Sequence, residues 1–563
     1  MQSLPNHLQK YVVKQNYEKY TPLDQAVWRY VLRQLKNFLT KHAHESYLDG
    51  LEKTGIDVEQ IPRIENVSAH LEKFGWRAVP VSGFIPPAAF MELQSLNVLP
   101  IASDMRSIDH LLYTPAPDIV HEAAGHAPII ANTEYSDYLK QYAQIAKKAI
   151  LSKQDLEQYQ AIRELSDIKE NPSSTALEIS AAEEKLKHVM NETAFISEAA
   201  ELSRMNWWTA EYGLVGQVDS AKIFGAGLLS SIGESKWCLS DKVKKIPLTL
   251  DCVKQSYDIT EPQPQLFVAQ NFKDLSRVLD ELAETMAFRK GGSIALDKAV
   301  QAATVNTVQF ENGLQISGVL KSYRRAADES IAYVQFEGPT QLCLSDKEIA
   351  GHDSKYHQHG YGTPVGTIQN LNFAALEVQA DNELTYESGI SVRGRLDQIK
   401  KLSDKAVILT FSQATCEWNG EKLFLPEWGL YDILLVNQVT SVFGGPADRA
   451  AYGDFDDFIA ARVQETRYTD EQKKRFTDYQ KVRSFREYKA ATADEFKELF
   501  LKISQEMPNE WLLYVELLEI GYQRNYDVGF LKLVEFHLST LQKKNDEIKS
   551  LIEEGIRLAH AKY

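Results

Sequence analysis

The sequence predicts a multidomain fold in which a mainly α-helical domain is followed by a small all-β domain and a C-terminal α-helical domain. At 563 residues the chain is too long for one hydrophobic core. Helical periodicity dominates to about residue 295, short alternating runs occupy residues 300–445, and helical periodicity returns from residue 447. We therefore expect domains at residues 1–295, 300–445 and 447–563, with the first boundary in the glycine-containing segment 291–293.

The first domain is predicted to be helical over residues 7–60, where Leu23 to Thr40 is strongly periodic and Pro22 lies in the first turn. Residues 137–205 are rich in Leu, Ala, Glu, Lys and Gln, which favour helices, and turn residues interrupt them at 171–175. This pattern predicts a helical hairpin inserted at about 140–195.

The second domain is predicted from runs that alternate apolar and polar residues, such as 307–310, 314–320, 331–336, 407–411 and 431–436. Asn312-Gly313 and Asn419-Gly420 are typical of hairpin turns. We expect an all-β barrel or sandwich of unknown role. The last helical segment, from Leu531 to Ile552, has too few clean heptads for a coiled coil, so we expect it to pack on its own domain.

Composition excludes several classes of protein. A net charge of −16 argues against nucleic acid and anionic membranes as partners, and no apolar run is long enough to span a bilayer. The first residues lack a basic segment followed by an apolar one, so we expect no secretion signal and a cytoplasmic location. The four cysteines are scattered and are expected to be buried free thiols. The oligomeric state stays open.

The residues with the clearest chemistry are His121 and His126, just after a proline-rich turn, and Glu211, inside an apolar helix. Two imidazoles and one carboxylate form the ligand set that holds one face of Fe(II) in non-heme oxygenases. Residues five apart do not share a face of an α-helix, so a common metal requires an irregular or terminal turn. A zinc peptidase with Glu122 as base is an alternative that this spacing disfavours, and a catalytically silent sensor or scaffold is another.

Three segments carry a family resemblance. Tyr113-Thr-Pro-X-Pro-Asp-X-X-His121-Glu-X-X-Gly-His126-X-Pro128, Trp207-X-Thr-X-Glu211-X-Gly-Leu214 and Phe224-Gly-Ala-Gly-Leu-Leu-Ser-Ser-X-Gly-Glu234 occur in one order. Together they resemble the pterin-dependent aromatic amino acid hydroxylases over residues 10–285. The resemblance implies a mainly α catalytic domain of that family. It also implies a monooxygenase that uses Fe(II), O2 and a reduced tetrahydropterin to hydroxylate a free aromatic amino acid.

The resemblance also implies roles for individual residues. The expected iron ligands and catalytic residues are His121, His126 and Glu211; the expected pterin-binding residues are Phe84, Ile85, Phe90 and Glu122; the expected substrate-binding residues are Arg106, Thr114, Trp207, Ser230 and Ile259. Arg106 would clamp the substrate carboxylate, and Trp207 would form a wall beside the ring. Asp118 is either an acceptor that orients an imidazole N–H or a helix N-cap.

Ile259 bears on the choice of substrate. The resemblance places it where phenylalanine hydroxylases carry an apolar residue and tyrosine hydroxylases an acid, so we expect L-phenylalanine to be converted to L-tyrosine. Tyrosine or tryptophan hydroxylation is the alternative within the family.

One further cluster, His352, His357 and His359, lies in the all-β domain. Three imidazoles within eight residues are compatible with metal binding, but an exposed, flexible loop is the simpler interpretation, since the sequence shows no distant ligand.

Overall fold

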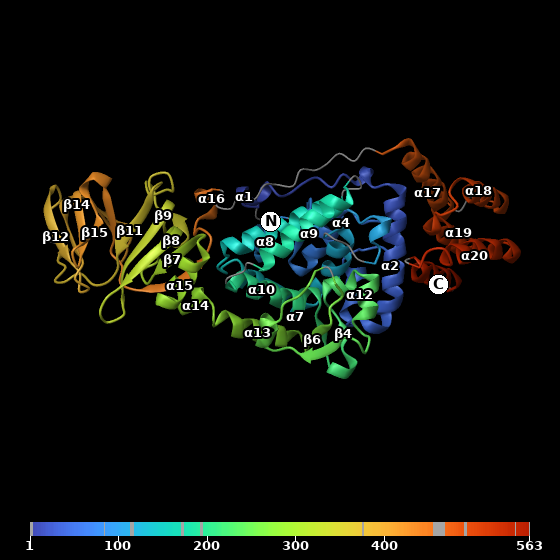
Figure 1. Ribbon diagram of the computed structural model, residues 1–563, viewed down its shortest axis with the longest axis horizontal. Helices are drawn as coiled ribbons and strands as arrows, with labels where there is room; N and C mark the ends of the chain where they lie inside the picture. Colours follow the sequence, from blue (N-terminus) through green and yellow to red (C-terminus); the bar gives the residue numbers. More distant parts are fainter. Residues whose placement is uncertain are drawn as a thin grey trace.

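The structure is a computed structural model that describes residues 4–83, 85–112, 117–170, 174–191, 195–259, 261–373, 376–453, 468–488, 492–546 and 548–561. Figure 1 shows three parts in a row: β-sheets at one end, a helical body in the middle and a group of helices at the other end. The order of helical, β and helical parts agrees with the sequence prediction.

The helical body is organised around α2 (Pro22–His42), which lies where the periodic segment predicted a helix. Its start is defined by a capping box: Asp24 N donates to Thr21 Oγ1 at 3.1 Å, and Thr21 N donates to Asp24 Oδ2 at 2.7 Å. Pro22 suits the first turn because it has no N–H to leave unpaired.

Short helices and two small sheets make up the rest of the body, and α2 lies at its edge, beside the C-terminal helices (Figure 1). Parallel strands β1 and β2 form one sheet, and the other has the order β4-β3-β6-β5. The elements are α1 (Asn6–Gln9), α3 (Ser46–Lys53), α4 (Ile64–Leu71), β1 (Arg77–Val81), α5 (Pro87–Ser95), β2 (Val98–Ala102), α6 (Ala127–Ile130), α7 (Thr133–Ala146), α10 (Glu198–Asn206), β3 (Leu214–Val215), β4 (Lys222–Ile223), α11 (Ala226–Leu229), α12 (Ile232–Trp237), β5 (Lys244–Pro247), β6 (Gln265–Ala269), α13 (Phe272–Ala283) and α14 (Ala287–Lys290).

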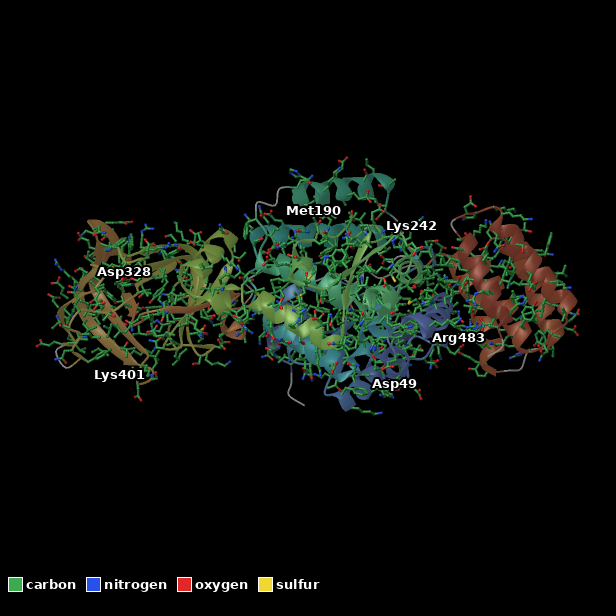
Figure 2. The ribbon with its side chains drawn as sticks, turned by 90° about the horizontal axis from the view of Figure 1, so that it is seen from below. Asp49, Met190, Lys242, Asp328, Lys401 and Arg483 are labelled. Atoms are coloured by element: carbon green, nitrogen blue, oxygen red, sulfur yellow. The ribbon has the colours of Figure 1, made fainter. Side chains whose placement is uncertain are left out.

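The predicted helical insertion is a hairpin of α8 (Lys153–Glu170) and α9 (Ala176–Asn191). Its two helices share a small core of their own, made of Ala161, Leu165, Ala182 and Leu186. Figure 2 shows it standing off from the body, with Met190 near the end of α9. The predicted start at residue 140 falls inside α7, whose buried side chains belong to the body instead.

The β part consists of two antiparallel sheets that share buried side chains. The first has the order β10-β9-β8-β7-β17 with β11 beside β9; the second has the order β12-β13-β14-β15 with β16 beside β14. The strands are β7 (Val305–Phe310), β8 (Leu314–Arg325), β9 (Ile331–Leu344), β10 (Lys347–Glu348), β11 (Gly360–Pro364), β12 (Ala380–Thr385), β13 (Ser391–Lys401), β14 (Val407–Trp418), β15 (Glu421–Phe424), β16 (Tyr431–Leu434) and β17 (Val439–Gly444).

Both predicted hairpin turns are present, one between β7 and β8 and one between β14 and β15. Asn419 and Gly420 have φ values of 51° and 84°, the left-handed backbone that this turn type requires.

The glycine-containing segment at 291–293 is not an exposed linker. It starts α15 (Gly292–Ala302), whose buried residues pack into the core of the β part. A Cβ atom on Gly291 would lie 2.6 Å from the carbonyl oxygen of Thr440. The predicted boundary at residue 295 therefore falls inside a helix that joins the helical body to the sheets.

The remaining helices are α16 (Arg449–Tyr452), α17 (Asp470–Tyr488), α18 (Ala493–Glu506), α19 (Trp511–Gln523), α20 (Val528–Gln542) and α21 (Lys549–His560). The core of this group is α19, which is buried from Trp511 to Gly521, and both α20 and α21 pack on it as expected for a self-docking segment. Trp511 meets Tyr30 of α2 edge to face, with ring centroids 5.2 Å apart. All four cysteines are buried and free, as predicted. Within the described ranges, no helix combines the length and the apolar character that a membrane span requires.

Candidate active site

His121 and His126 lie on η4 (Val120–His126), a π-helix. Because π-helical hydrogen bonds run from residue i to i+5, residues five apart return to nearly the same side, whereas an α-helix would turn them well away from each other. The predicted irregular turn is thus a π-helix. Its start follows Pro117; Pro115, the other proline expected to contribute, lies outside the described residues.

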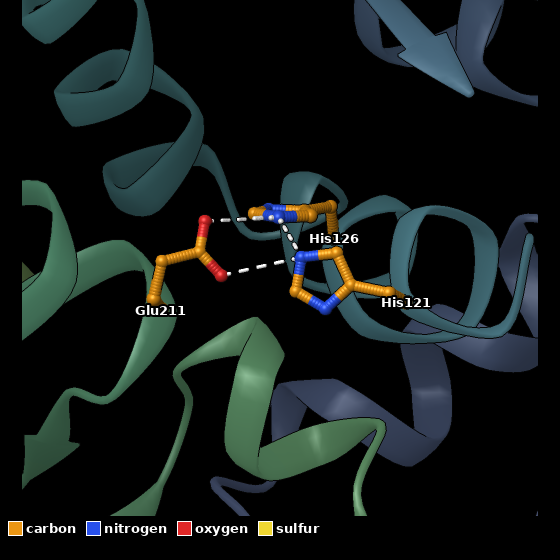
Figure 3. A group of neighbouring side chains, drawn as sticks. All are labelled: His121, His126 and Glu211. Atoms are coloured by element: carbon orange, nitrogen blue, oxygen red, sulfur yellow. Dashed lines mark hydrogen bonds and ion pairs between the residues drawn. The ribbon is translucent and has the colours of Figure 1, made fainter. Parts of the chain in front are cut away.

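Glu211 ends a second π-helix, η5 (Trp207–Glu211), which continues from α10. The two imidazole Nε2 atoms are 3.2 Å apart, and each lies 3.3 Å from one oxygen of the Glu211 carboxylate (Figure 3). Ligands at right angles, about 2.1 Å from one ion, would be separated by about 3 Å, so this spacing fits a shared metal. The structure brings together the three residues expected to bind iron.

Burial disfavours the charged form of Glu211, but His126 and His121 outweigh this effect and hold its pKa well below the usual range. A carboxylate that stays ionised is the form required to bind a metal.

Ser230 orients one of the imidazoles. Its Oγ lies 3.1 Å from His121 Nδ1 and also donates to the Ala226 carbonyl at 2.7 Å. Ser230 was expected near the amino-acid end of the substrate, which stays a prediction; the contact that the structure shows is with the ring of His121. A partner on the second ring nitrogen leaves Nε2 free for a metal.

Arg106 is almost completely buried and forms a two-pronged pair with Asp118, with Nε–Oδ2 and Nη2–Oδ1 distances of 2.8 and 2.7 Å. Its Nη1 donates to the Ser230 carbonyl at 3.1 Å. Within the described part of the chain, three of the five guanidinium N–H groups are used in these bonds, which leaves two for another acceptor.

Asp118 does not accept from an imidazole. Its Oδ1 instead accepts from the backbone N of His121 at 3.0 Å, which matches the helix-capping alternative. Burial disfavours the charged form of Asp118, but Arg106 outweighs it and lowers the pKa of this carboxyl.

Glu122 and Glu234 are buried acids beside the three ligands. Burial raises the pKa of Glu122 to about 8 even though His126 lowers it, and its Oε2 has no hydrogen-bond partner. Glu234 accepts from the Tyr212 hydroxyl at 2.6 Å, and burial raises its pKa to about 7. Sequence reasoning gave no role to Glu234 or Tyr212, although both lie within the quoted motifs. Acids that are protonated near neutral pH are typical of functional sites.

Trp207 is held between two tyrosine rings. It stacks on Tyr212 at a centroid distance of 4.5 Å and on Tyr257 at 4.3 Å. Both tyrosine rings thus stack on the indole, and the expected role of Trp207 as a wall beside the substrate ring stays a prediction. Ile259 is half-buried two residues beyond Tyr257.

Two of the expected pterin-binding residues, Ile85 and Phe90, lie near the start of α5. Ile85 precedes this helix, and its carbonyl accepts from the hydroxyl of Tyr159 in the inserted hairpin at 2.8 Å. Phe90 lies on α5 and is half-buried. Phe84, and the expected substrate residue Thr114, lie outside the described residues.

The comparisons with known proteins agree on one family. A family model described as biopterin-dependent aromatic amino acid hydroxylase matches residues 9–163 and 189–311. Phenylalanine-4-hydroxylase of Mesorhizobium japonicum is 30% identical over 294 residues, which cover 51% of this chain and 90% of that protein. Phenylalanine-4-hydroxylase of Bos taurus is 32% identical over 274 residues, 48% of this chain and 51% of that protein. The chain thus spans about half the length of the bovine relative.

A solved structure of Chromobacterium violaceum phenylalanine hydroxylase with iron(III) and 7,8-dihydrobiopterin covers 50% of this chain and 94% of its own, with 23% identity and a TM-score of 0.38. The gap in the family match, residues 164–188, lies within the α8–α9 hairpin.

Proposed function

Because this chain belongs to the biopterin-dependent aromatic amino acid hydroxylases, we propose that its substrate is L-phenylalanine and its product L-tyrosine. The observation that carries the proposal is the arrangement of His121, His126 and Glu211 around one point. Enzymes of this family use iron and tetrahydrobiopterin.

Iron fits the residues present. Two neutral imidazoles and one ionised carboxylate would hold Fe(II) on one face and leave the other face open to O2 and substrate. When bound, the iron and the reduced pterin supply the activated oxygen that hydroxylates the ring. The protein supports this by keeping Glu211 ionised and by orienting His121 through Ser230.

The substrate would be positioned by its carboxylate. The two unused N–H groups of Arg106 are suited to it, because the guanidinium is already fixed by Asp118 and costs little to orient. The acids Glu122 and Glu234 are mostly protonated below neutral pH, so there Asp118 and Glu211 are the ionised acids nearest to the reaction.

Phenylalanine is favoured over tyrosine by Ile259. An apolar side chain accepts an unsubstituted ring, but it offers no partner to a phenol hydroxyl, which would be buried without a hydrogen bond. The names of the bacterial and bovine relatives point to the same substrate.

The test is product analysis with phenylalanine, tyrosine and tryptophan, each with and without reduced pterin. We expect pterin-dependent tyrosine formation and the highest kcat/KM for phenylalanine. A higher kcat/KM for tyrosine or tryptophan would overturn the substrate, and turnover without pterin would overturn the proposed reaction.

The roles of the ligands are tested by His121→Ala, His126→Ala and Glu211→Ala. Each variant should lose turnover and bound iron, while His188→Ala, an exposed change in the hairpin, should lose neither. Near-normal hydroxylation by any of the three would contradict the assignment.

A further inference from the structure

A second group of metal-ligating side chains lies in the β part, at the opposite side of the helical body from α17–α21 (Figure 1). His352 and His357 lie in the loop between β10 and β11, and Asp432 lies on β16. His352 Nδ1 is 3.3 Å from His357 Nε2 and 3.8 Å from Asp432 Oδ2. All three ligand atoms lie within 4.8 Å of one another.

The loop that carries the two histidines is held to strand β9 by its backbone. Leu342 N donates to the His352 carbonyl at 3.0 Å, and Thr340 N donates to the His357 carbonyl at 3.1 Å. His352 is only 6% exposed. The sequence favoured an exposed, flexible loop without a distant ligand, but the structure fixes both histidines and supplies Asp432 from 75 residues beyond His357.

The carboxylate of Asp432 is buried, and a bound cation would stabilise its negative charge. Its side chain is 2% exposed, and Oδ1 accepts from Thr410 Oγ1 at 2.6 Å. Among the described residues, Oδ2 accepts no hydrogen bond of ordinary geometry. The Tyr356 phenol also interacts with Asp432, but it makes no hydrogen bond of ordinary geometry to Oδ2. A buried carboxylate is costly unless its charge is paired, and a bound cation would pair it fully.

We propose that His352, His357 and Asp432 bind a divalent transition-metal ion of the zinc class. Two imidazoles and a carboxylate suit such an ion, and tetrahedral ligands about 2.05 Å from it would lie about 3.3 Å apart, close to the separation of the two imidazole nitrogens. Three protein ligands leave a fourth position for water or a small oxygen ligand. His359 is exposed and is not part of this group.

Binding there would connect the two sheets. The histidine loop joins strands of the first sheet, whereas Asp432 belongs to β16 of the second. Its carboxylate is further fixed by Thr410 of the neighbouring strand β14, and its backbone carbonyl accepts from the Tyr361 hydroxyl at 2.8 Å. The ion would therefore act as a cross-link within the β part, independent of the hydroxylase site.

The experiment uses the full chain with the hydroxylase site removed by His121→Ala and His126→Ala, so that only the second site is measured. Zinc is titrated by calorimetry, and metal retained after desalting is measured by mass spectrometry. We expect one zinc per chain in this background. Adding Asp432→Asn or His357→Gln should weaken zinc binding at least 100-fold, whereas His359→Ala, in the same loop, should leave it unchanged.

Circular dichroism checks that each variant is folded, and the effect of zinc on Tm gives a second readout. Zinc should raise the Tm of the background protein and of His359→Ala, but not that of Asp432→Asn. If Asp432→Asn does not fold, the zinc binding of His357→Gln is the deciding measurement, because the His357 side chain lies at the edge of the group. The proposal is overturned if the background protein binds no zinc, or if the Asp432 and His357 variants bind it as tightly as the background does.

Discussion

At the scale of single residues, the Ser230 hydroxyl contacts His121, one of the proposed iron ligands. It touches His121 Nδ1 on one side and the carbonyl of Ala226 on the other, so the imidazole is fixed relative to α11. We predict that Ser230→Ala lowers iron affinity about 10- to 100-fold, because partners of this kind fix ring orientation and basicity.

The matched control for Ser230 is Ser231→Ala, measured in the same iron titration. Ser231 caps α12 and donates to the Leu112 carbonyl at 3.0 Å without touching the three ligands. Its loss should reduce stability but leave iron affinity unchanged. If Ser230→Ala and Ser231→Ala bind iron equally tightly, Ser230 does not contribute to the proposed iron site.

Glu234 provides a pH-dependent test. Its pKa rises from 4.5 to about 7 on folding because the carboxyl is buried, so the stability contributed by the protonated form is complete below pH 4.5 and is lost as pH rises through 7. Between pH 4.5 and 8 the free energy of unfolding should therefore fall by about 3 kcal/mol more than in Glu234→Gln, which cannot ionise. Urea unfolding at several pH values measures this, with exposed Glu498→Gln as the control. If the free energy of unfolding depends on pH in the same way in the native protein and in Glu234→Gln, the prediction is wrong.

At the scale of elements, the inserted hairpin reaches the expected pterin site. The Tyr159 hydroxyl on α8 donates to the carbonyl of Ile85, so the insertion contacts a segment that the resemblance assigns to cofactor binding. We predict that Tyr159→Phe raises the KM for reduced pterin several-fold and changes the KM for the amino acid little.

The control for Tyr159 is Glu164→Gln, which breaks an exposed pair with Lys185 in the same hairpin and leaves Ile85 alone. Steady-state kinetics with each substrate varied separately distinguishes the two effects. If Tyr159→Phe changes only the KM for the amino acid, the hairpin does not act on the expected pterin site.

At the scale of the whole molecule, a buried ionic network joins α2 to the C-terminal helices. Arg29 donates to Glu516 at 2.9 Å and to Glu519 at 2.7 Å, and Glu519 also pairs with Arg33. Removing the charge of one member leaves the opposite charges of its partners buried and unpaired. We predict that Glu519→Gln destabilises the packing of α19 on α2 by about 3–5 kcal/mol.

Thermal unfolding and limited proteolysis of the 468–561 region measure the effect of Glu519→Gln. Asp49→Asn, which removes an exposed pair with Lys53, should change stability by less than about 0.5 kcal/mol. Equal effects of the two changes would contradict an anchoring role for the network.

The modular arrangement gives a second prediction at this scale. We propose that residues 1–295 carry the hydroxylase activity, since every proposed site residue precedes residue 263. A fragment ending at residue 303 is the better test, because it keeps α15 whole. We expect pterin-dependent hydroxylation from this fragment, with a lower Tm. A folded, iron-loaded fragment without activity would show that later segments complete the site.

The sequence by itself determined the family, the three candidate iron ligands and the type of each part. These are local properties: motif order, apolar periodicity and the Asn-Gly turns each depend on residues close in the chain. The helical hairpin was predictable for the same reason, since its small core forms between its own two helices.

The tertiary structure alone decided which distant groups meet. In the helical body, Asp118 pairs with Arg106, and two tyrosine rings stack on Trp207. In the β part, α15 packs into the core, and Asp432 lies beside His352 and His357. The π-helix around His121 belongs here too, because the contact with Ser230, more than 100 residues away, helps to fix it. Such contacts depend on the packing of segments far apart in sequence, and local patterns carry no information about them.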